Sequence, residues 1–281
     1  MNVVIIGSGV MATGIAQVLL NSEEVVLVTV IARTIIKTKN IRNSCQKHLS
    51  RLVRKSALTS VQADSNINKL ILSTDYQAIT ESSLVIEAVA ENFEVKLSIF
   101  KAIKPYVNSK TIIASNTSSL SITAFASIFD NPENIVGLHF FNPAPVMELV
   151  EIVVGHVTSN SVVDELLLFT KTLGKLPVVV NEAPGFVVNR MLIPMINEAV
   201  SILAEGVASA EDIDKAMKFG AHHPMGPLAL ADLIGNDVNL SIMETLYSET
   251  GDPKYRAHPL LRKMVRANHL GRKSKKGFFE Y

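Results

Sequence analysis

The sequence predicts an α/β protein: a doubly wound, mostly parallel sheet followed by a smaller all-helical domain. Three observations support this prediction. Short apolar runs alternate with helical patterns through the first two thirds of the 281 residues. The first run leads directly into a glycine-rich turn and a helix, as in a βαβ unit. After Pro184 and Gly185, the pattern becomes almost wholly helical.

Six apolar runs are predicted to be buried strands, because they are β-branched and bounded by turn residues or charges. They are Val3–Ile6, Val25–Val28, Leu84–Glu87, Thr111–Ala114, Ile135–Phe140 and Leu176–Val180. No hairpin signal joins them, which favours parallel pairing through crossover helices. The helical patterns between them are Met11–Leu20, Ile35–Lys55, Phe93–Lys104 and Leu120–Ile128. Those of the last third are Val187–Glu205, Ala208–Phe219, Leu228–Thr250 and Pro259–Asn268.

The composition is that of a folded protein without a strong charge bias. Apolar residues make up 48% of the chain, which argues against disorder. The net charge of +1 argues against a nucleic-acid or membrane-surface binder. The single cysteine, Cys45, permits no internal disulfide, and its basic and amide neighbours indicate a solvated helix rather than a catalytic thiol. With no secretory signal or membrane-spanning run, we expect a cytoplasmic protein.

The turn in "VVIIGSGVMATGIA" has the G-x-G-x-x-A form of a dinucleotide-binding fingerprint. Gly7 permits the tight turn, Gly9 lets a pyrophosphate approach the backbone, and Ala12 is small enough for close helix–sheet packing. The following helix N-terminus offers N–H groups to phosphates. Tight packing without a ligand is the alternative. We therefore expect a dinucleotide-binding domain over residues 1–183 and a helical domain over residues 184–281; the family resemblance given below implies that this second domain binds substrate and dimerises.

The acidic residue that usually holds a ribose hydroxyl is missing. Twenty residues after Gly9, its place falls on Thr29, whose hydroxyl bonds a ribose more weakly than a carboxylate. Arg33 follows closely, and a basic residue in place of the acid can accept a 2′-phosphate. Alternatively, Arg33 only begins a solvated basic helix. The sequence thus leaves both NAD and NADP open.

The stretch "IVGLHFFNPAPVMELVEIV" suggests acid–base chemistry. His139 ends an apolar strand, on the edge where parallel sheets bind ligands, and Glu151 lies in a second apolar run that can return beside it. A carboxylate on one imidazole nitrogen fixes the tautomer, so that the other nitrogen can take a hydroxyl proton. A core histidine with a surface glutamate is the alternative. Other polar residues follow strands or interrupt apolar helices: Ser118, Glu91, Lys96 and Asn189.

These motifs resemble those of the short-chain L-3-hydroxyacyl-CoA dehydrogenases, which include 3-hydroxybutyryl-CoA dehydrogenase. In chain order they are "GSGVMATGIA", "VIEAVAEN", "SNTSSL", "GLHFFNPAPVMELVEIV", "PGFVVNR", "HPMGPLALADLIG" and "GRKSKKGFFEY". The resemblance implies reversible, NAD-linked oxidation of a (3S)-3-hydroxyacyl-CoA to the 3-oxoacyl-CoA. It also implies a Rossmann-type domain and a homodimer formed through the helical domain.

The resemblance also implies roles for individual residues. His139 is the expected general base and Glu151 its orienting carboxylate, while Ser118 and Asn189 hold the substrate's oxygens. The expected cofactor contacts are Gly7, Gly9, Val10, Met11, Ala12, Thr29, Glu91, Lys96, Ser118, Asn142 and Lys273. Arg51 and Lys55, with Ser118, match the CoA contacts, although a solvated helix face explains the two basic residues equally well.

Several positions depart from the family pattern. Ala12 and Thr29 replace a glycine and an aspartate, and Ser56 and Lys275 stand where glycine is more common, so we expect these two loops to be altered. One rival function is an NADP-linked dehydrogenase of another 3-hydroxy acid or of a carrier-protein thioester. Another is a non-catalytic CoA-binding subunit that has lost cofactor affinity. No metal site is expected, because His222 and His223 lack partners at ligand spacing.

Overall fold

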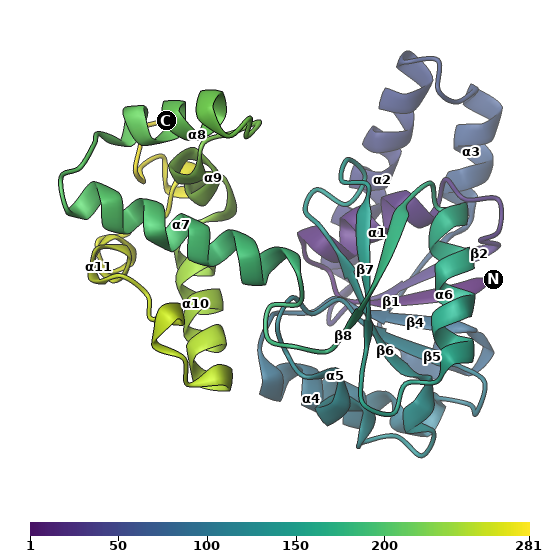
Figure 1. Cartoon of the computed structure of the whole chain (residues 1–281). Coiled ribbons are helices and arrows are strands. Elements are labelled where there is room, and N and C mark those ends of the chain that lie inside the picture. Colours follow the sequence, from purple (N-terminus) through teal and green to yellow (C-terminus); the bar gives the residue numbers. More distant parts are fainter. The chain divides into compact units, whose positions relative to one another are not determined.

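The computed structural model describes the backbone of all 281 residues and every side chain except those of residues 35, 37 and 38. The chain forms two compact units, Met1–Glu182 and Ala183–Tyr281 (Figure 1). The first holds an eight-stranded sheet with helices, and the second is built from helices. The predicted fold class is confirmed.

The strand order is β3-β2-β1-β4-β5-β6-β7-β8. The strands are β1 Asn2–Ile6, β2 Leu27–Ile31, β3 Leu70–Ser73, β4 Leu84–Glu87, β5 Ile112–Ser115, β6 Ile135–Phe140, β7 Leu149–Val154 and β8 Leu176–Asn181. The pairings from β3 to β6 are parallel, whereas β7 runs antiparallel to β6. No hairpin signal predicts this reversal, because residues 141–148 form a longer connection than the short turns that such signals mark.

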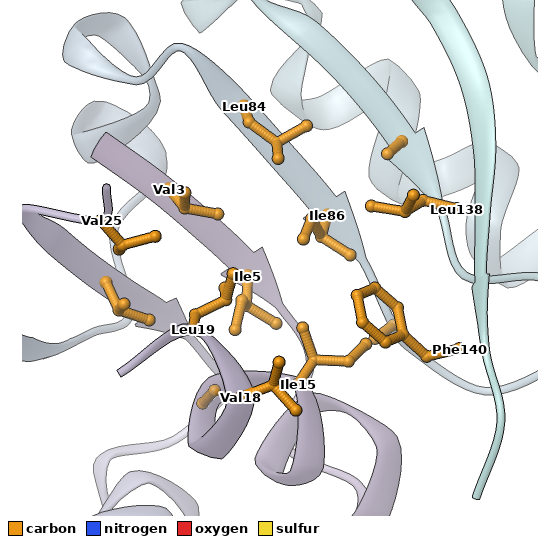
Figure 2. Packing of buried hydrophobic residues seen from close by; sticks show 14 of the residues in the cluster. Val3, Ile5, Ile15, Val18, Leu19, Val25, Leu84, Ile86, Leu138 and Phe140 are labelled. Atoms are coloured by element: carbon orange, nitrogen blue, oxygen red, sulfur yellow. The ribbon is translucent and has the colours of Figure 1, made fainter. Parts of the chain in front are cut away.

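Helices cover both faces of the sheet. They are α1 Val10–Leu19, α2 Ile35–Arg54, α3 Ser60–Asn68, α4 Phe93–Ile103, α5 Ile122–Ala126 and α6 Asn160–Thr172. Figure 2 shows alternate residues of β1, β4 and β6 packed against apolar side chains of α1, among them Ile15 and Leu19. The same core receives residues of α2 and α6. This packing fixes where each strand ends, and so where the loops that follow the strands begin.

The second strand lies further along the chain than predicted. The expected Val25–Val28 includes Val26, which is 67% exposed, and the observed strand ends at Ile31, paired with Ile6. The backbone N–H of Gly7 donates to the Ile31 carbonyl at 2.9 Å, so the glycine turn lies level with the end of β2. Thr29 is therefore in the middle of a strand rather than at its end.

Cys45 lies on the buried face of α2 rather than on its solvated face. It is fully buried in the core, because the basic residues of this amphipathic helix occupy other positions of the turn. Burial raises the pKa of the Cys45 thiol to about 11, with the Arg42 charge acting in the opposite direction. The thiol is thus a small core side chain, consistent with the expectation that it is not catalytic.

The second unit contains α7 Val188–Ala204, α8 Ala210–Gly220, α9 Pro227–Ile234, α10 Asn236–Thr250 and α11 Pro259–Arg266. The single helix expected over Leu228–Thr250 is broken at Gly235, whose φ of 108° does not fit a helix. Ser56 and Lys275 keep the left-handed backbone that suits glycine, with φ of 57° and 60°. Replacing glycine at these two positions has therefore left the backbone turn in place.

Candidate active site

Polar loops gather at the carboxyl ends of the central strands. Ile6 of β1 pairs with Glu87 of β4, and Glu87 pairs with Ser115 of β5, so these strands end at the same edge. The loops that leave this edge are the glycine turn, residues 88–92 and residues 116–121. Open parallel sheets bind ligands at this edge.

His139 and Glu151 face each other across the antiparallel pair β6–β7. The Nδ1 atom of His139 lies 2.8 Å from Glu151 Oε2. Both residues are buried, at 6% and 1% exposure, and the His139 ring packs against Phe141 with 4.4 Å between ring centroids. A buried carboxylate at Nδ1 holds the ring and stabilises its protonated form, which suits a group that gains and loses a proton.

Glu91 organises the loop that carries Ser118. Its Oε1 atom accepts hydrogen bonds from the Thr117 hydroxyl at 2.6 Å, the Ser118 N–H at 2.7 Å and the Ser118 hydroxyl at 3.0 Å. Burial raises the pKa of Glu91, but the Lys96 charge and these hydrogen bonds lower it by more, so the net pKa is below its usual range. Glu91 is therefore a stable anion that fixes the backbone and hydroxyl of Ser118.

Lys96 is wholly buried between two carboxylates. Its Nζ atom lies 2.7 Å from Glu87 Oε1 and 3.3 Å from Glu91 Oε2. Glu87 also accepts from the Ser115 hydroxyl and the Val89 N–H. Lys96 thus ties β4, β5 and the Ser118 loop together. The sequence placed Glu87 at the end of a predicted strand but did not reveal this role, which depends on its neighbours in the sheet.

A further hydrogen bond links this loop to the histidine strand. The side-chain oxygen of Asn116 accepts the Phe140 N–H at 2.9 Å. The residue after His139 is thereby attached to the loop that carries Ser118. The first unit thus brings Glu91, Lys96 and Ser118 together in one network, and this bond joins that network to the His139 strand.

A cavity of about 1000 Å³ surrounds the glycine turn and includes Gly7, Gly9, Val10 and Met11 in its lining. Gly7 has φ of 140°, and a side-chain carbon there would lie 2.4 Å from the Ala88 carbonyl oxygen. At Gly9 such a carbon would meet no protein atom within 4 Å. Helix α1 begins there without a side-chain cap or an acidic residue in its first turn. These features fit a dinucleotide pyrophosphate. Ala12 is buried beneath the turn.

The end of this cavity where β2 finishes differs from the expectation. Thr29 is buried within β2, paired with Val4 and Ile71, and is not among the described residues of the cavity wall. The wall is formed instead by residues at and beyond the end of β2, by one residue of α2 and by two residues after β3. These are Ile31, Ala32, Arg33, Asn40, Thr74 and Tyr76.

The remaining predicted residues of the first unit lie beside this cavity or on α2. Asn142 lines a neighbouring cavity of about 430 Å³ together with Ser8 and Gly9, so it adjoins the glycine turn. Arg51 and Lys55 are exposed, at the end of α2 and at its C-cap. A separate hollow on α2, of about 310 Å³, is lined by other residues, including Lys47 and Arg54.

Two predicted residues belong to the second unit. Asn189 is half-buried in the first turn of α7. Lys273 is half-exposed and its Nζ atom lies 2.6 Å from Asp237 Oδ2. Among the described side chains, no cluster of histidine, cysteine or acidic residues could hold a metal ion. Within the described part of the chain, no helix is long and apolar enough to cross a membrane.

Comparison with known proteins places both units in one family. Residues 2–183 match the 3-hydroxyacyl-CoA dehydrogenase NAD binding domain, and residues 185–281 match the C-terminal domain of the same family. The chain is 48% identical over its whole length to the 3-hydroxybutyryl-CoA dehydrogenase of Clostridioides difficile, covering 99% of that protein. It is 38% identical to the mitochondrial hydroxyacyl-coenzyme A dehydrogenase of Sus scrofa, again over its whole length and covering 91% of that protein.

Solved structures agree. The crystal structure of (S)-3-hydroxybutyryl-CoA dehydrogenase from Ralstonia eutropha matches with a TM-score of 0.94 at 44% identity, covering the whole of this chain and 98% of that one. The Mycobacterium tuberculosis FadB2 structure matches with a TM-score of 0.95 at 38% identity and the same coverage. The predicted resemblance is confirmed: the chain belongs to the 3-hydroxyacyl-CoA dehydrogenase family.

Proposed function

We propose that this chain catalyses the reversible oxidation of a short-chain (3S)-3-hydroxyacyl-CoA, such as 3-hydroxybutyryl-CoA, to the 3-oxoacyl-CoA. The observation that carries the proposal is the buried His139–Glu151 pair, with 2.8 Å between Nδ1 and Oε2. A histidine held by a carboxylate in this way is suited to act as a general base, which accepts a proton in one step and then releases it. The 3-hydroxybutyryl-CoA dehydrogenases among the relatives support the choice of substrate.

In the proposed mechanism, His139 accepts the proton of the substrate's 3-hydroxyl group at Nε2. Glu151 stabilises the resulting imidazolium through Nδ1 and keeps the ring in the tautomer that can accept that proton. In the reverse direction, the imidazolium donates the proton to the 3-oxo oxygen. When bound, the nicotinamide dinucleotide supplies the hydride acceptor or donor of the reaction.

Ser118 and Asn189 are proposed to hold the substrate's oxygens. The Ser118 hydroxyl donates a hydrogen bond to Glu91, so its oxygen lone pairs are left to accept a hydrogen bond from a substrate hydroxyl. Asn189 offers an amide that can donate to a carbonyl oxygen. Arg51 and Lys55 are proposed to bind the phosphates of CoA, because both are exposed cations at the same end of α2.

The residues that would hold the nicotinamide dinucleotide are those of the glycine turn, Gly7 to Met11, at the N-terminus of α1. Asn142 adjoins the same turn. Glu91 and Lys96 are proposed to act by fixing the Ser118 loop, because Lys96 is wholly buried. Lys273, a residue of the second unit, is proposed as a further contact of the nicotinamide dinucleotide.

The test is reduction of acetoacetyl-CoA, followed by loss of nicotinamide absorbance, with NADH and with NADPH. His139→Gln is expected to lower kcat by about a hundredfold to ten-thousandfold with either cofactor, the usual contribution of a general base. His156→Gln, at an exposed histidine of the same unit, is the control and should retain full activity. Near-normal turnover by His139→Gln, with an unchanged unfolding curve, would overturn the assignment of the base.

We also propose that the protein works as a homodimer formed through residues 183–281. This unit exposes large apolar side chains, among them Met191 at 73% and Phe219 at 75%. Light scattering on the purified chain should give twice the monomer mass. A monomer at micromolar concentration with full activity would contradict the proposal.

A further inference from the structure

We propose that this chain selects the 2′-phosphorylated cofactor, NADP(H), and that Arg33 is the residue that recognises the 2′-phosphate. The inference rests on the proposed function in one respect only: that a nicotinamide dinucleotide occupies the cavity around the glycine turn. It concerns the other end of that cavity, where β2 ends.

No described residue at the carboxyl end of β2 places a carboxylate on the cavity wall, where a ribose would need one. The residues at the carboxyl end of β2 that face the cavity are Ile31 and Ala32. Among all described residues of the cavity wall, none is acidic. Asp75, which lies between the wall residues Thr74 and Tyr76, accepts a hydrogen bond from the Gln77 N–H and is not itself part of the wall. A 2′-hydroxyl therefore meets none of the acceptors that favour NAD.

The Arg33 guanidinium stands close to where the missing acid would be. Arg33 is exposed, follows Ala32 directly, and is the only charged group among the described residues of the cavity wall. A guanidinium presents donors in a fixed fork that matches the oxygens of a phosphate. Ala32, which lines the same cavity, has only a methyl side chain and so adds neither negative charge nor bulk next to Arg33 in the chain.

Two neutral polar residues, Asn40 and Thr74, line the same cavity wall. Asn40 comes from α2 and Thr74 directly follows β3, so three separate segments contribute polar residues to the wall of the same cavity. An amide and a hydroxyl can both donate to phosphate oxygens. The first turn of α2 adds no acidic residue that would repel a dianion. The adenosine end of the cavity is thus built for an anion.

The inference is tested by calorimetric titration with two fragments that differ only in the 2′-phosphate, 2′,5′-ADP and 5′-AMP. The unaltered chain should bind 2′,5′-ADP tighter by about tenfold or more, which is about 1.4 kcal/mol. In Arg33→Ala the ratio of the two affinities should fall to within about twofold of unity, because the charge-assisted contact is lost. Lys39→Ala removes one exposed positive charge from α2, the helix that begins two residues after Arg33, at a position outside the cavity wall, and it should keep the preference.

Steady-state kinetics give the second readout. Arg33→Ala should raise the KM for NADPH by about tenfold while leaving kcat and the KM for NADH within about twofold, since the lost contact is remote from the chemistry. The double variant Ala32→Asp/Arg33→Ala, which restores an acid at the end of β2, should prefer NADH. The NADPH preference of the unaltered chain should also weaken with salt, as expected for a solvent-exposed charge contact.

The outcomes separate this inference from the proposed reaction. Equal affinity for the two fragments, no detectable binding of 2′,5′-ADP, or an equal loss in Arg33→Ala and Lys39→Ala would each overturn the inference. Turnover of acetoacetyl-CoA with NADH in preference to NADPH would overturn it while leaving the dehydrogenase activity intact. A clear preference for 2′,5′-ADP without turnover with either cofactor would support the inference and contradict the proposed substrate.

Discussion

The two ends of the ligand-binding edge are constructed in opposite ways. At the end where β6 meets β7, His139 and Glu151 are buried and hydrogen-bonded to each other. At the end where β2 finishes, Arg33 and Asn40 are exposed on the wall of a large cavity. The first arrangement fixes the position of the proposed acid–base group before any ligand arrives. The second leaves an exposed charge, for which we propose the 2′-phosphate as the partner.

The largest effect is expected from removing the Glu151 carboxylate, which completes the buried pair with His139. Glu151→Gln keeps the size of the side chain but removes the charge that stabilises the His139 imidazolium. We expect kcat for acetoacetyl-CoA reduction to fall by about a thousandfold, within the range of general acid–base contributions. Glu148→Gln, on the exposed connection before β7, is the matched control. A kcat within about twofold of the unaltered chain would show that the pair is structural only.

Lys96 tests whether buried charges hold together the network of Glu87, Glu91 and the Ser118 loop, which adjoins the His139 strand. Lys96→Met fills the same space but leaves Glu87 fully buried without its cation. Breaking a buried pair in this way lowers the free energy of unfolding by about 3–5 kcal/mol. Urea denaturation measures the loss, and Lys101→Met, at an exposed position of the same helix, should change stability by less than about 0.5 kcal/mol. A loss below about 1 kcal/mol for Lys96→Met would contradict this account.

The same network makes a prediction about acid. Because the pKa of Glu91 is lowered in the folded chain, its anion contributes stability that is fully present above the unfolded pKa of about 4.3. That contribution is lost as the pH falls through the lower folded pKa. The unaltered chain should therefore be more stable than Glu91→Gln near pH 7, and the difference should shrink below about pH 4. Unfolding midpoints measured across this range would contradict the prediction if the two curves ran parallel.

The smallest expected change in stability lies at the end of the sheet edge where β2 finishes. Arg33→Ala should change the free energy of unfolding by less than about 0.5 kcal/mol, because an exposed side chain outside the core contributes little to folding. The same variant is expected to alter cofactor affinity strongly. A large loss of stability without any ligand would show that Arg33 has a structural role, and the contrast between the two ends would fail.

The sequence predicted the β6–β7 end better than the β2 end, for a physical reason. His139 and Glu151 are only 12 residues apart in consecutive apolar runs, so their proximity could be expected, although the antiparallel direction of β7 was not predicted. The end of β2 depends instead on its register with β1 and β3, which is not encoded within the strand itself. Counting residues from the glycine turn therefore pointed to Thr29, although the cavity wall begins at Ile31.

Other features could be found only in three dimensions. The alternation of apolar and helical patterns was enough to predict the sheet and the helical second unit. It did not predict the short β3, the antiparallel β7 or the break at Gly235. Lys96 has the pattern of a ligand contact in the sequence, but its burial between Glu87 and Glu91 appears only when β4 and α4 are packed together.

The antiparallel β7 has a consequence for how such a protein can diverge. Because β7 turns back along β6, both members of the acid–base pair lie on one continuous stretch, residues 139–151. The residues that line the adenosine end lie far upstream, from Ile31 to Tyr76. On the two proposals made above, mutation or recombination in the upstream segment would exchange one cofactor for the other while the His139–Glu151 pair is inherited unchanged. Lineages that keep the same reaction can then draw on different cellular pools of reducing power.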